Sequence, residues 1–133
     1  RDLTLVAASH SAYLCEQAAE ILAAEDISAE VIDVRVLSPL DARPIINSVQ
    51  KTGRLFAVDG GWRTAGWSAE ILAAVTEAVH PTALRARPVR ITLPDAPAPT
   101  SKALEEIYYP TAATIVDVVR ANLGQETHVK ASA

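Results

Sequence analysis

The sequence has little of what several classes of protein require. Its 133 residues include a single cysteine and no methionine. Because Cys15 has no second cysteine to pair with in the chain, the fold does not depend on an oxidising compartment. No apolar run is long enough to span a bilayer. We therefore expect a cytoplasmic protein, or a protein of the mitochondrial matrix if the source is eukaryotic.

The chain also lacks a block of like charge. Its 12 basic and 16 acidic residues give a net charge of -4, and the acidic residues are scattered. This distribution indicates neither nucleic acid nor an anionic membrane as a partner. The composition is globular and the length suits one domain. Because the sequence begins at Arg1, directly before a strand-like run, we expect it to be a segment of a longer protein.

Strand and helix patterns alternate along the chain. Short apolar runs predict strands at residues 3–8, 30–34, 54–59 and 88–93. Helical spacing of apolar residues predicts four helices, at residues 11–25, from Asp41 onward, at residues 64–79, and in a last segment that ends at Gly124. Ser11 and Asp41 are the expected caps of the first two helices.

This alternation predicts an α/β fold with three layers, in which helices cover both faces of a mainly parallel sheet. With the strands numbered along the chain, we expect the order 2-1-3-4. The domain should span residues 1–124. Residues 125–133 are polar and carry no pattern, so they are expected to form a flexible tail.

In this strand order, the ends of the first and third strands meet at the topological switch point, where such sheets bind ligands. His10 and Asp59 should therefore lie at the same edge. One interpretation makes them a base and the carboxylate that orients it. The other, which we favour, is a surface histidine beside a carboxylate that caps a helix.

The stretch DGGWRTAGWS, residues 59–68, comes close to a phosphate-binding loop. It has the spacing G-x-x-x-x-G, but Trp67 stands where the loop requires lysine. Ser68 lacks the G-x-S-x-G context of a hydrolase nucleophile. The cysteine and histidines show no zinc-binding spacing. We therefore expect no catalytic, cofactor-binding or metal-binding residue in this chain.

The same stretch concentrates aromatic residues and arginine, which are typical of protein interfaces. The predicted interface residues are Trp62, Arg63, Thr64 and Trp67. In the alternative interpretation, Trp67 packs beneath its own helix and Trp62 shields the edge of the sheet. We favour the interface.

Several separated stretches together resemble one family. They are DVRVLSPLD at residues 33–41, KTGR at 51–54, GWRTAG at 61–66, AEI at 69–71, PDAPAP at 94–99, LE at 104–105 and YYP at 108–110. In order and spacing, residues 2–123 resemble the C-terminal domain of the transketolase family. The resemblance is strongest to the β-subunits of thiamine-dependent 2-oxo acid dehydrogenases, although Ala65 replaces a glycine that is frequent in the family.

This resemblance implies a non-catalytic assembly domain. In the family, thiamine diphosphate and Mg²⁺ are held by other domains, through a G-D-G motif and a glutamate. The order at residues 59–61 is Asp-Gly-Gly, so we expect no cofactor in this chain and no activity from it alone. The full enzyme would decarboxylate a 2-oxo acid oxidatively and transfer the acyl group to a lipoyl group.

The implied partners are an α-subunit, a second β-subunit and the dihydrolipoyl acyltransferase core. The family's sheet also has an extra antiparallel strand, encoded before the present region. Without it, the edge beside residues 31–34 would be unpaired, so we expect a homodimer through that edge or through the tryptophan turn. Two alternatives are the equivalent domain of a transketolase or deoxyxylulose-phosphate synthase, and an independent flavodoxin-like binding module.

Overall fold

The computed structural model describes the backbone of residues 1–131 and the side chains of residues 1–124. Four parallel strands form one sheet: β1 (Leu3–Ala7), β2 (Ala29–Asp33), β3 (Leu55–Trp62) and β4 (Val89–Leu93). Their order is β2-β1-β3-β4. Val6 of β1 lies opposite Ile32 of β2 and Ala57 of β3. The predicted parallel sheet and its strand order are confirmed.

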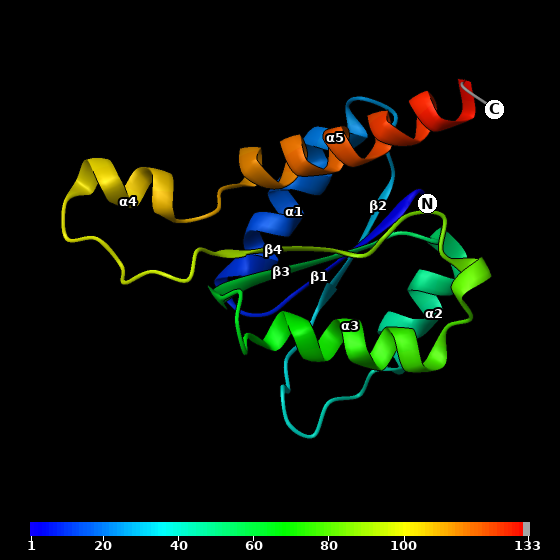
Figure 1. Ribbon diagram of the computed structural model, residues 1–133, viewed down its shortest axis with the longest axis horizontal. Helices are drawn as coiled ribbons and strands as arrows, with labels where there is room; N and C mark the ends of the chain where they lie inside the picture. The colour runs from blue at the N-terminus through cyan, green and yellow to red at the C-terminus, as the bar shows by residue number, and fades with distance from the viewer. Residues whose placement is uncertain (132–133) are drawn as a thin grey trace.

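Helices cover both faces of this sheet (Figure 1). On one face lie α1 (His10–Ala23) and α5 (Ala112–Ala131), and on the other lie α2 (Arg43–Thr52) and α3 (Trp67–Ala78). A 3-10 turn, η1 (Pro81–Ala83), precedes β4. A short helix, α4 (Lys102–Tyr108), stands apart from both layers. The three-layer α/β/α class is therefore confirmed.

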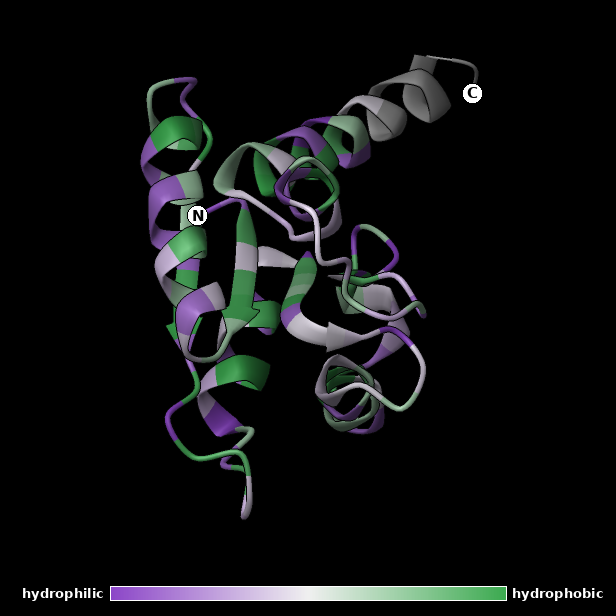
Figure 2. Cartoon of the chain, turned by 90° about the vertical axis from the view of Figure 1, so that its left-hand side faces the viewer, coloured by the Kyte–Doolittle hydropathy of each residue, from purple (hydrophilic) through white to green (hydrophobic). Residues whose placement is uncertain are grey.

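The alternation of side chains along the strands divides the core in two. Leu5 and Phe56 pack with α1 and α5, whereas Val6 and Leu55 pack with α2 and α3. All five residues of β1 are buried, as expected for a central strand covered on both faces. In Figure 2, hydrophobic colouring runs along much of the strands, whereas the helices carry both hydrophobic and hydrophilic residues.

A buried group of hydroxyls joins α2 to the sheet. Thr4 Oγ1 lies 2.8 Å from Ser48 Oγ and 2.8 Å from Thr52 Oγ1. All three residues are buried. The Thr52 hydroxyl also donates to the carbonyl of Arg54 at 3.2 Å. Each of the three hydroxyls therefore has a hydrogen-bond partner, as buried polar groups require.

Several predicted helix boundaries are wrong. Ser11 is not a cap, because α1 begins at His10 and Ser9 occupies the cap position. Asp41 lies one residue before the cap position, although its Oδ1 still accepts from the N–H of Arg43 at 3.2 Å. α3 begins at Trp67 and not at residue 64, because β3 continues as far as Trp62.

The last helix does not end at Gly124. α5 continues to Ala131, since one glycine in a helix costs only about 1 kcal/mol relative to alanine and its neighbours can offset that cost. The flexibility of residues 125–133 stays a prediction, and residues 132–133 lie outside the described part of the chain. The sequence pattern also missed α4 entirely.

Candidate subunit interface at the carboxyl edge of the sheet

Asp59 organises the glycine-rich turn that follows β3. Its Oδ1 accepts from the backbone N–H of Gly61 at 2.8 Å, and its Oδ2 accepts from the N–H of Ser68 at 2.8 Å. Ser68 is in the first turn of α3, where N–H groups have no partner within the helix. The carboxylate thus occupies the position at which an anion would bind a helix N-terminus. The phosphate-loop-like spacing therefore serves to close a turn.

Only glycine fits at position 66. A Cβ there would lie 2.1 Å from the carbonyl oxygen of Trp62 and 3.0 Å from Asp59 Oδ2. The preceding residue, Ala65, has φ 55, a left-handed conformation that costs an L-residue about 1–2 kcal/mol. The family's frequent glycine at this position would avoid that cost.

Asp95 fastens the turn to the segment after β4. Its two carboxylate oxygens accept from the N–H of Thr64 at 2.9 Å and from the Thr64 hydroxyl at 2.7 Å. These bonds, the backbone bond first, hold the pKa of Asp95 below its usual range, and the neighbouring Arg63 adds to the effect. Arg90 Nη1 donates to the carbonyl of Arg63 at 2.9 Å. Thr64 and the backbone of Arg63 therefore make internal contacts.

The two tryptophans face different environments. Trp67 packs against the core beneath α3, and its indole nitrogen is buried without a hydrogen-bond partner. Trp62 is 56% exposed, and its indole N–H donates to the Tyr108 hydroxyl at 3.3 Å. The packing interpretation thus describes Trp67, whereas Trp62 and Arg63 are presented to solvent.

The segment after β4, residues 94–111, forms a projecting arm that contains α4 (Figure 1). Tyr108 ties it back to the domain, because its hydroxyl accepts from the indole N–H of Trp62 at 3.3 Å. The same hydroxyl donates to the carbonyl of Ala96 at 2.6 Å within the arm. No residue of α4 is buried. Ile107 is 81% exposed and Leu104 52%. The arm therefore presents apolar side chains that the described part of the domain does not cover.

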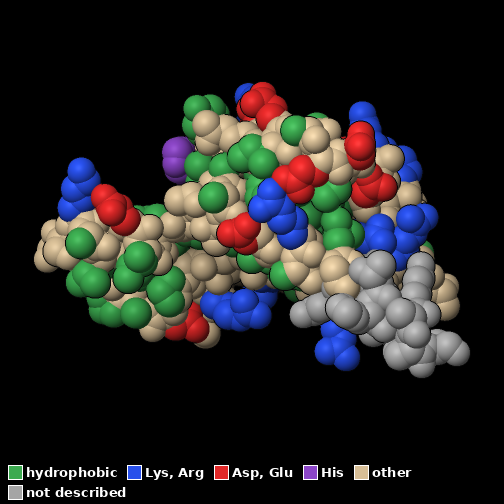
Figure 3. All heavy atoms as spheres, turned by 90° about the horizontal axis from the view of Figure 1, so that it is seen from above, with side chains coloured by type: hydrophobic (Ala, Val, Ile, Leu, Met, Phe, Trp, Pro, Cys, Tyr) green, Lys and Arg blue, Asp and Glu red, His purple; other side chains and the backbone are tan. Residues whose placement is uncertain are grey.

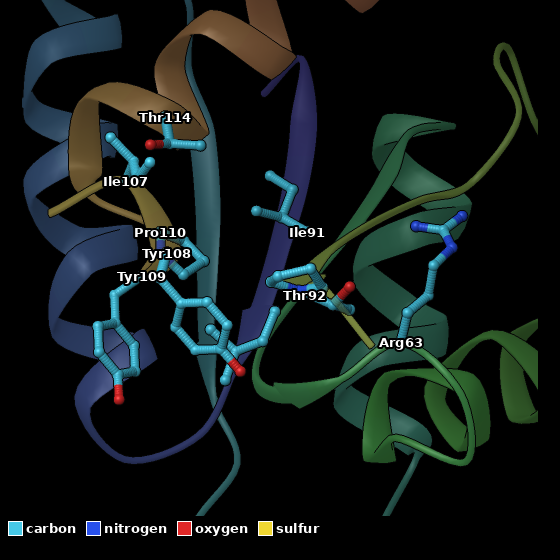
Figure 4. Close-up of a pocket in the computed structure, with 10 residues that line it drawn as sticks. Arg63, Ile91, Thr92, Ile107, Tyr108, Tyr109, Pro110 and Thr114 are labelled. Atoms are coloured by element: carbon cyan, nitrogen blue, oxygen red, sulfur yellow. The ribbon is translucent and has the colours of Figure 1, made fainter. Parts of the chain in front are cut away.

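Two hollows flank the contact between Trp62 and Tyr108. One, of about 460 Å³, lies between the arm and β4. Figure 4 shows Tyr108 and Tyr109 on one side of it and Ile91 on the other, with the Arg63 side chain directed away. The second, of about 390 Å³, is lined by Trp62 and four residues of the neighbouring loops.

Most of the large exposed apolar residues follow the carboxyl ends of the strands. Of the eight such residues in the described part of the chain, seven belong to segments that follow the carboxyl end of a strand. They are Tyr13 after β1, Val36 and Leu37 after β2, Trp62 at the end of β3, and Leu104, Ile107 and Tyr109 after β4. The eighth, Ile21, lies near the C-terminal end of α1, whereas Tyr13 lies near the start of that helix, close to the end of β1. The sequence analysis identified only Trp62 among the seven.

His10 and Asp59 lie at the same edge, since one begins α1 after β1 and the other ends the buried part of β3. Within the described residues no hydrogen bond joins them. The His10 ring instead lies 6.1 Å from the ring of Tyr13, and both oxygens of Asp59 hold the turn. The capping interpretation describes Asp59, and a role for the pair in binding stays a prediction.

Other reactive groups are few. Burial raises the pKa of the Cys15 thiol to about 12, with a smaller contribution from Glu16, so the thiol is protonated at neutral pH and is a poor nucleophile. Among the described residues there is no group of three or more His, Cys, Asp or Glu side chains that could hold a metal ion. Nor does that part of the chain contain a helix long and apolar enough to cross a membrane.

The parallel sheet of order 2-1-3-4, covered by helices on both faces, defines a three-layer α/β domain, in which the glycine turn follows the third strand. The family model for the C-terminal domain of transketolase matches residues 1–115, and the chain belongs to this family. The flavodoxin-like alternative is therefore not retained.

Its relatives include β-subunits of dehydrogenases. The chain is 40% identical over 121 residues to the mitochondrial pyruvate dehydrogenase E1 component subunit beta of Dictyostelium discoideum, covering 90% of this chain and 33% of that protein. It is 34% identical to the acetoin:2,6-dichlorophenolindophenol oxidoreductase subunit beta of Cupriavidus necator, covering 96% and 38%. The chain thus spans little more than a third of these relatives.

Among solved structures, the fold is similar to a split-gene transketolase, described as an inactive beta4 tetramer. The TM-score is 0.78 at 27% identity, and the match covers 92% of this chain and 39% of that one. The likeness agrees with the family and with the layered architecture.

Proposed function

We propose that this chain is the assembly domain of a β-subunit of a thiamine diphosphate-dependent 2-oxo acid dehydrogenase. The full enzyme would decarboxylate a 2-oxo acid and transfer the acyl group to a lipoyl group, with thiamine diphosphate and Mg²⁺ held outside this domain. The family and the names of the relatives support this assignment. The observation that carries the assembly role is the exposure of seven large apolar residues in segments that follow the carboxyl ends of the strands, three of them on the projecting arm.

The physical argument is the cost of leaving this surface in water. Fully burying a side chain such as Ile107 stabilises a complex by about 1.5–3 kcal/mol, and clustered exposed apolar residues mark protein contacts. Trp62 adds an aromatic anchor with a polar tip, the type that dominates interface energetics. The hydrogen bonds that Asp59 and Asp95 accept fix the turn after Trp62 before any partner binds. This order reduces the entropy lost on binding.

The proposed partners are an α-subunit, a second β-subunit and the dihydrolipoyl acyltransferase core, and the isolated chain should form a homodimer. The outer edge of β2 offers a second route to pairing, because β2 lies at one end of the sheet. The proposed location is the mitochondrial matrix if the source is eukaryotic, which agrees with the relatives named as mitochondrial. For any other source the proposed location is the cytoplasm.

Sedimentation velocity on matched variants tests the assembly role. Leu104→Glu/Ile107→Glu places two charges on the exposed face of α4 and should weaken self-association at least about tenfold, which corresponds to 1.4 kcal/mol. The control is Ile21→Glu, at the one large exposed apolar residue outside the carboxyl edge, which should leave association unchanged. A chain that stays monomeric at high concentration, or equal effects of both variants, would overturn the proposal.

The proposal that this chain has no cofactor site is tested by a separate binding measurement. Calorimetric titration of the chain with thiamine diphosphate and Mg²⁺ should show no binding, because the N–H of Ser68 is already occupied by Asp59. Micromolar binding would mean that this domain contributes directly to the cofactor site, and the non-catalytic assignment would be wrong.

A transketolase is the second candidate, because the similar solved structure is one. The dehydrogenase assignment is favoured because the β-subunit relatives reach higher sequence identities, up to 40% against 27%.

A further inference from the structure

The amino ends of the strands carry a group of basic residues that the proposed function does not use. Two connections meet there: the turn from Lys51 to Arg54 that ends α2, and the loop with Arg85 and Arg87 that leads into β4. The N–H of Arg85 donates to the carbonyl of Gly53 at 2.8 Å. The Arg85 side chain lies directly over this glycine, since an added Cβ would come within 2.6 Å of Arg85 Cγ.

Gly53 makes this close approach possible. It has φ 71 and ends α2 in the left-handed conformation, which glycine adopts without steric cost. A side chain here would push the two connections apart. The missing Cβ therefore brings Arg85 against the turn between Lys51 and Arg54.

The basic surface extends to the start of β1. Arg54 Nη1 donates to the carbonyl of Asp2 at 3.0 Å. Glu30 is shared by two cations, with Oε1 at 2.7 Å from Arg1 Nη1 and Oε2 at 2.9 Å from Lys51 Nζ. We call the five basic residues the amino-edge cluster: Arg1, Lys51, Arg54, Arg85 and Arg87. Among the described side chains, Glu30 pairs with two of these five cations and Asp2 adds a second carboxylate at this edge, so the cluster retains an excess of positive charge.

Two members of the cluster are available to a partner. Arg85 and Arg87 are exposed, and neither forms an ion pair with any side chain that the structure describes. This positive surface belongs to a chain with a net charge of -4, so the remaining surface is more negative than the total. Figure 3 shows Lys and Arg side chains, with Asp and Glu side chains among them, at the end of the molecule opposite the hydrophobic side chains of α4.

We propose that the amino-edge cluster binds an acidic polypeptide segment of a partner subunit. This inference rests on the proposed assembly function and adds the chemistry of a second contact. Arginine forks suit carboxylates, which they bind with two parallel hydrogen bonds. The cations come from three separate segments, which matches an extended chain better than one compact anion.

Other anionic macromolecules fit this surface less well. Single-stranded nucleic acid is bound by aromatic side chains as well as by cations, but the large exposed aromatic residues of the described chain, Tyr13, Trp62 and Tyr109, lie at the opposite edge. A membrane surface is bound by several apolar anchors beside basic residues, but seven of the eight described large exposed apolar residues follow the carboxyl ends of strands, and only Ile21 does not belong to that group.

Fluorescence anisotropy with a labelled poly-L-glutamate peptide tests the proposal on the 133-residue chain. Arg85→Gln/Arg87→Gln should weaken binding about tenfold at low salt, because it removes two exposed cations that form no ion pair with the described side chains. The matched control is Arg35→Gln/Arg43→Gln, which removes two exposed arginines that pair with Asp33 and Asp41. The control should change binding less than about twofold.

Added salt should weaken the binding of the unaltered chain, since exposed charges are screened. The proposal is overturned if poly-L-glutamate does not bind, or if both double variants weaken binding equally. Tighter binding of single-stranded DNA or of phosphatidylserine vesicles would assign the surface to nucleic acid or membrane instead. Circular dichroism checks that each variant folds. If the double variant does not fold, the single variant Arg87→Gln decides the test, and its affinity for poly-L-glutamate should fall about threefold.

Failure of the assembly function is distinguishable from failure of this inference. Leu104→Glu/Ile107→Glu changes the carboxyl edge only, so poly-L-glutamate binding should weaken by no more than the effect of its added negative charge. Loss of self-association with retained peptide binding in this variant would show two independent surfaces.

Discussion

The two ends of the sheet meet solvent in different ways. The carboxyl end exposes Trp62, Leu104 and Ile107, whereas the amino end exposes arginines and lysine. Water disfavours the first surface and solvates the second. The carboxyl end therefore needs a protein cover for its apolar area, while contacts at the amino end depend on charge and salt. One parallel fold thus provides two chemically distinct surfaces.

The largest expected effect is at the glycine turn of the carboxyl end. Gly66→Ala places a Cβ at 2.1 Å from the Trp62 carbonyl, so β3 and α3 must separate. We expect the free energy of unfolding to fall by more than about 3 kcal/mol. Urea denaturation measures this change.

The neighbouring residue provides the control. Ala65→Gly removes the strain of φ 55 but increases the entropy of the unfolded chain, so the net change should stay within about 1 kcal/mol and favour the folded state. Equal losses at positions 65 and 66 would show that the turn is generally intolerant, and the steric argument would not hold.

At the amino end, stability depends on a buried polar group. Thr4→Val removes the hydrogen bonds from Thr4 to Ser48 and to Thr52 and should cost about 2–3 kcal/mol, since two bonds between buried hydroxyls are lost. Thr76→Val is the control, because Thr76 is exposed and its hydroxyl bonds only its own helix. A loss below about 0.5 kcal/mol is expected there, and an equally small loss at Thr4 would contradict the account.

A smaller effect is expected from the cap of α3. Asp59→Ala removes the acceptor for the N–H groups of Gly61 and Ser68 and should cost about 1–2 kcal/mol. Asp59→Asn retains one acceptor oxygen and should recover part of the loss in thermal unfolding. If both variants are as stable as the original chain, Asp59 does not hold the turn.

The smallest effects concern pH. Lys51 is the main cause that lowers the pKa of Glu30 from 4.5 to about 2, with smaller contributions from Ser48 and Arg1. Because the folded pKa is depressed, the stabilisation is present above pH 4.5 and is lost as the pH falls toward 2. Asp95, whose pKa is also lowered, acts in the same direction at the other end.

Urea denaturation across this acidic range separates the two carboxylates. Glu30→Gln and Asp95→Asn should each flatten part of the decline in stability. High salt should reduce the Glu30 contribution, since its partners Arg1 and Lys51 are exposed. Identical pH slopes in the original chain and in Glu30→Gln would show that the ion pairs do not contribute.

The sheet was predictable because its strands are short, apolar and separated by helical periods. Buried β1 illustrates this, since Leu3, Leu5 and Val6 are apolar on both faces of the strand. The order of the strands is the one expected for a doubly wound sheet of this type. Local patterns and topology thus agree for the three layers.

The arm was not predictable from the same signals. Three prolines between residues 94 and 99 indicate an extended segment, and the following α4 has only seven residues and buries none of them. Its apolar residues Leu104 and Ile107 have helical spacing but no core to face. A pattern of burial cannot identify a helix that buries none of its side chains against the described part of the domain.

Two further features depended on tertiary structure. The register shift in β3 between Val58 and Trp62 directs Trp62 to solvent, while Trp67 packs on the core in the next helix. The amino-edge cluster is dispersed from residue 1 to residue 87 in the sequence. One signal was available, since its residues lie just before β1, β3 and β4, and strand starts meet at one edge of a parallel sheet.

Hydrogen–deuterium exchange at low and high protein concentration tests the assembly surface most directly. The account predicts that peptides covering Trp62 and the arm, residues 94–111, become protected as the chain associates. Peptides around Ile21 on α1 should exchange equally at both concentrations. Protection at α1 with no change in the arm would contradict the claim that the carboxyl edge is the assembly surface.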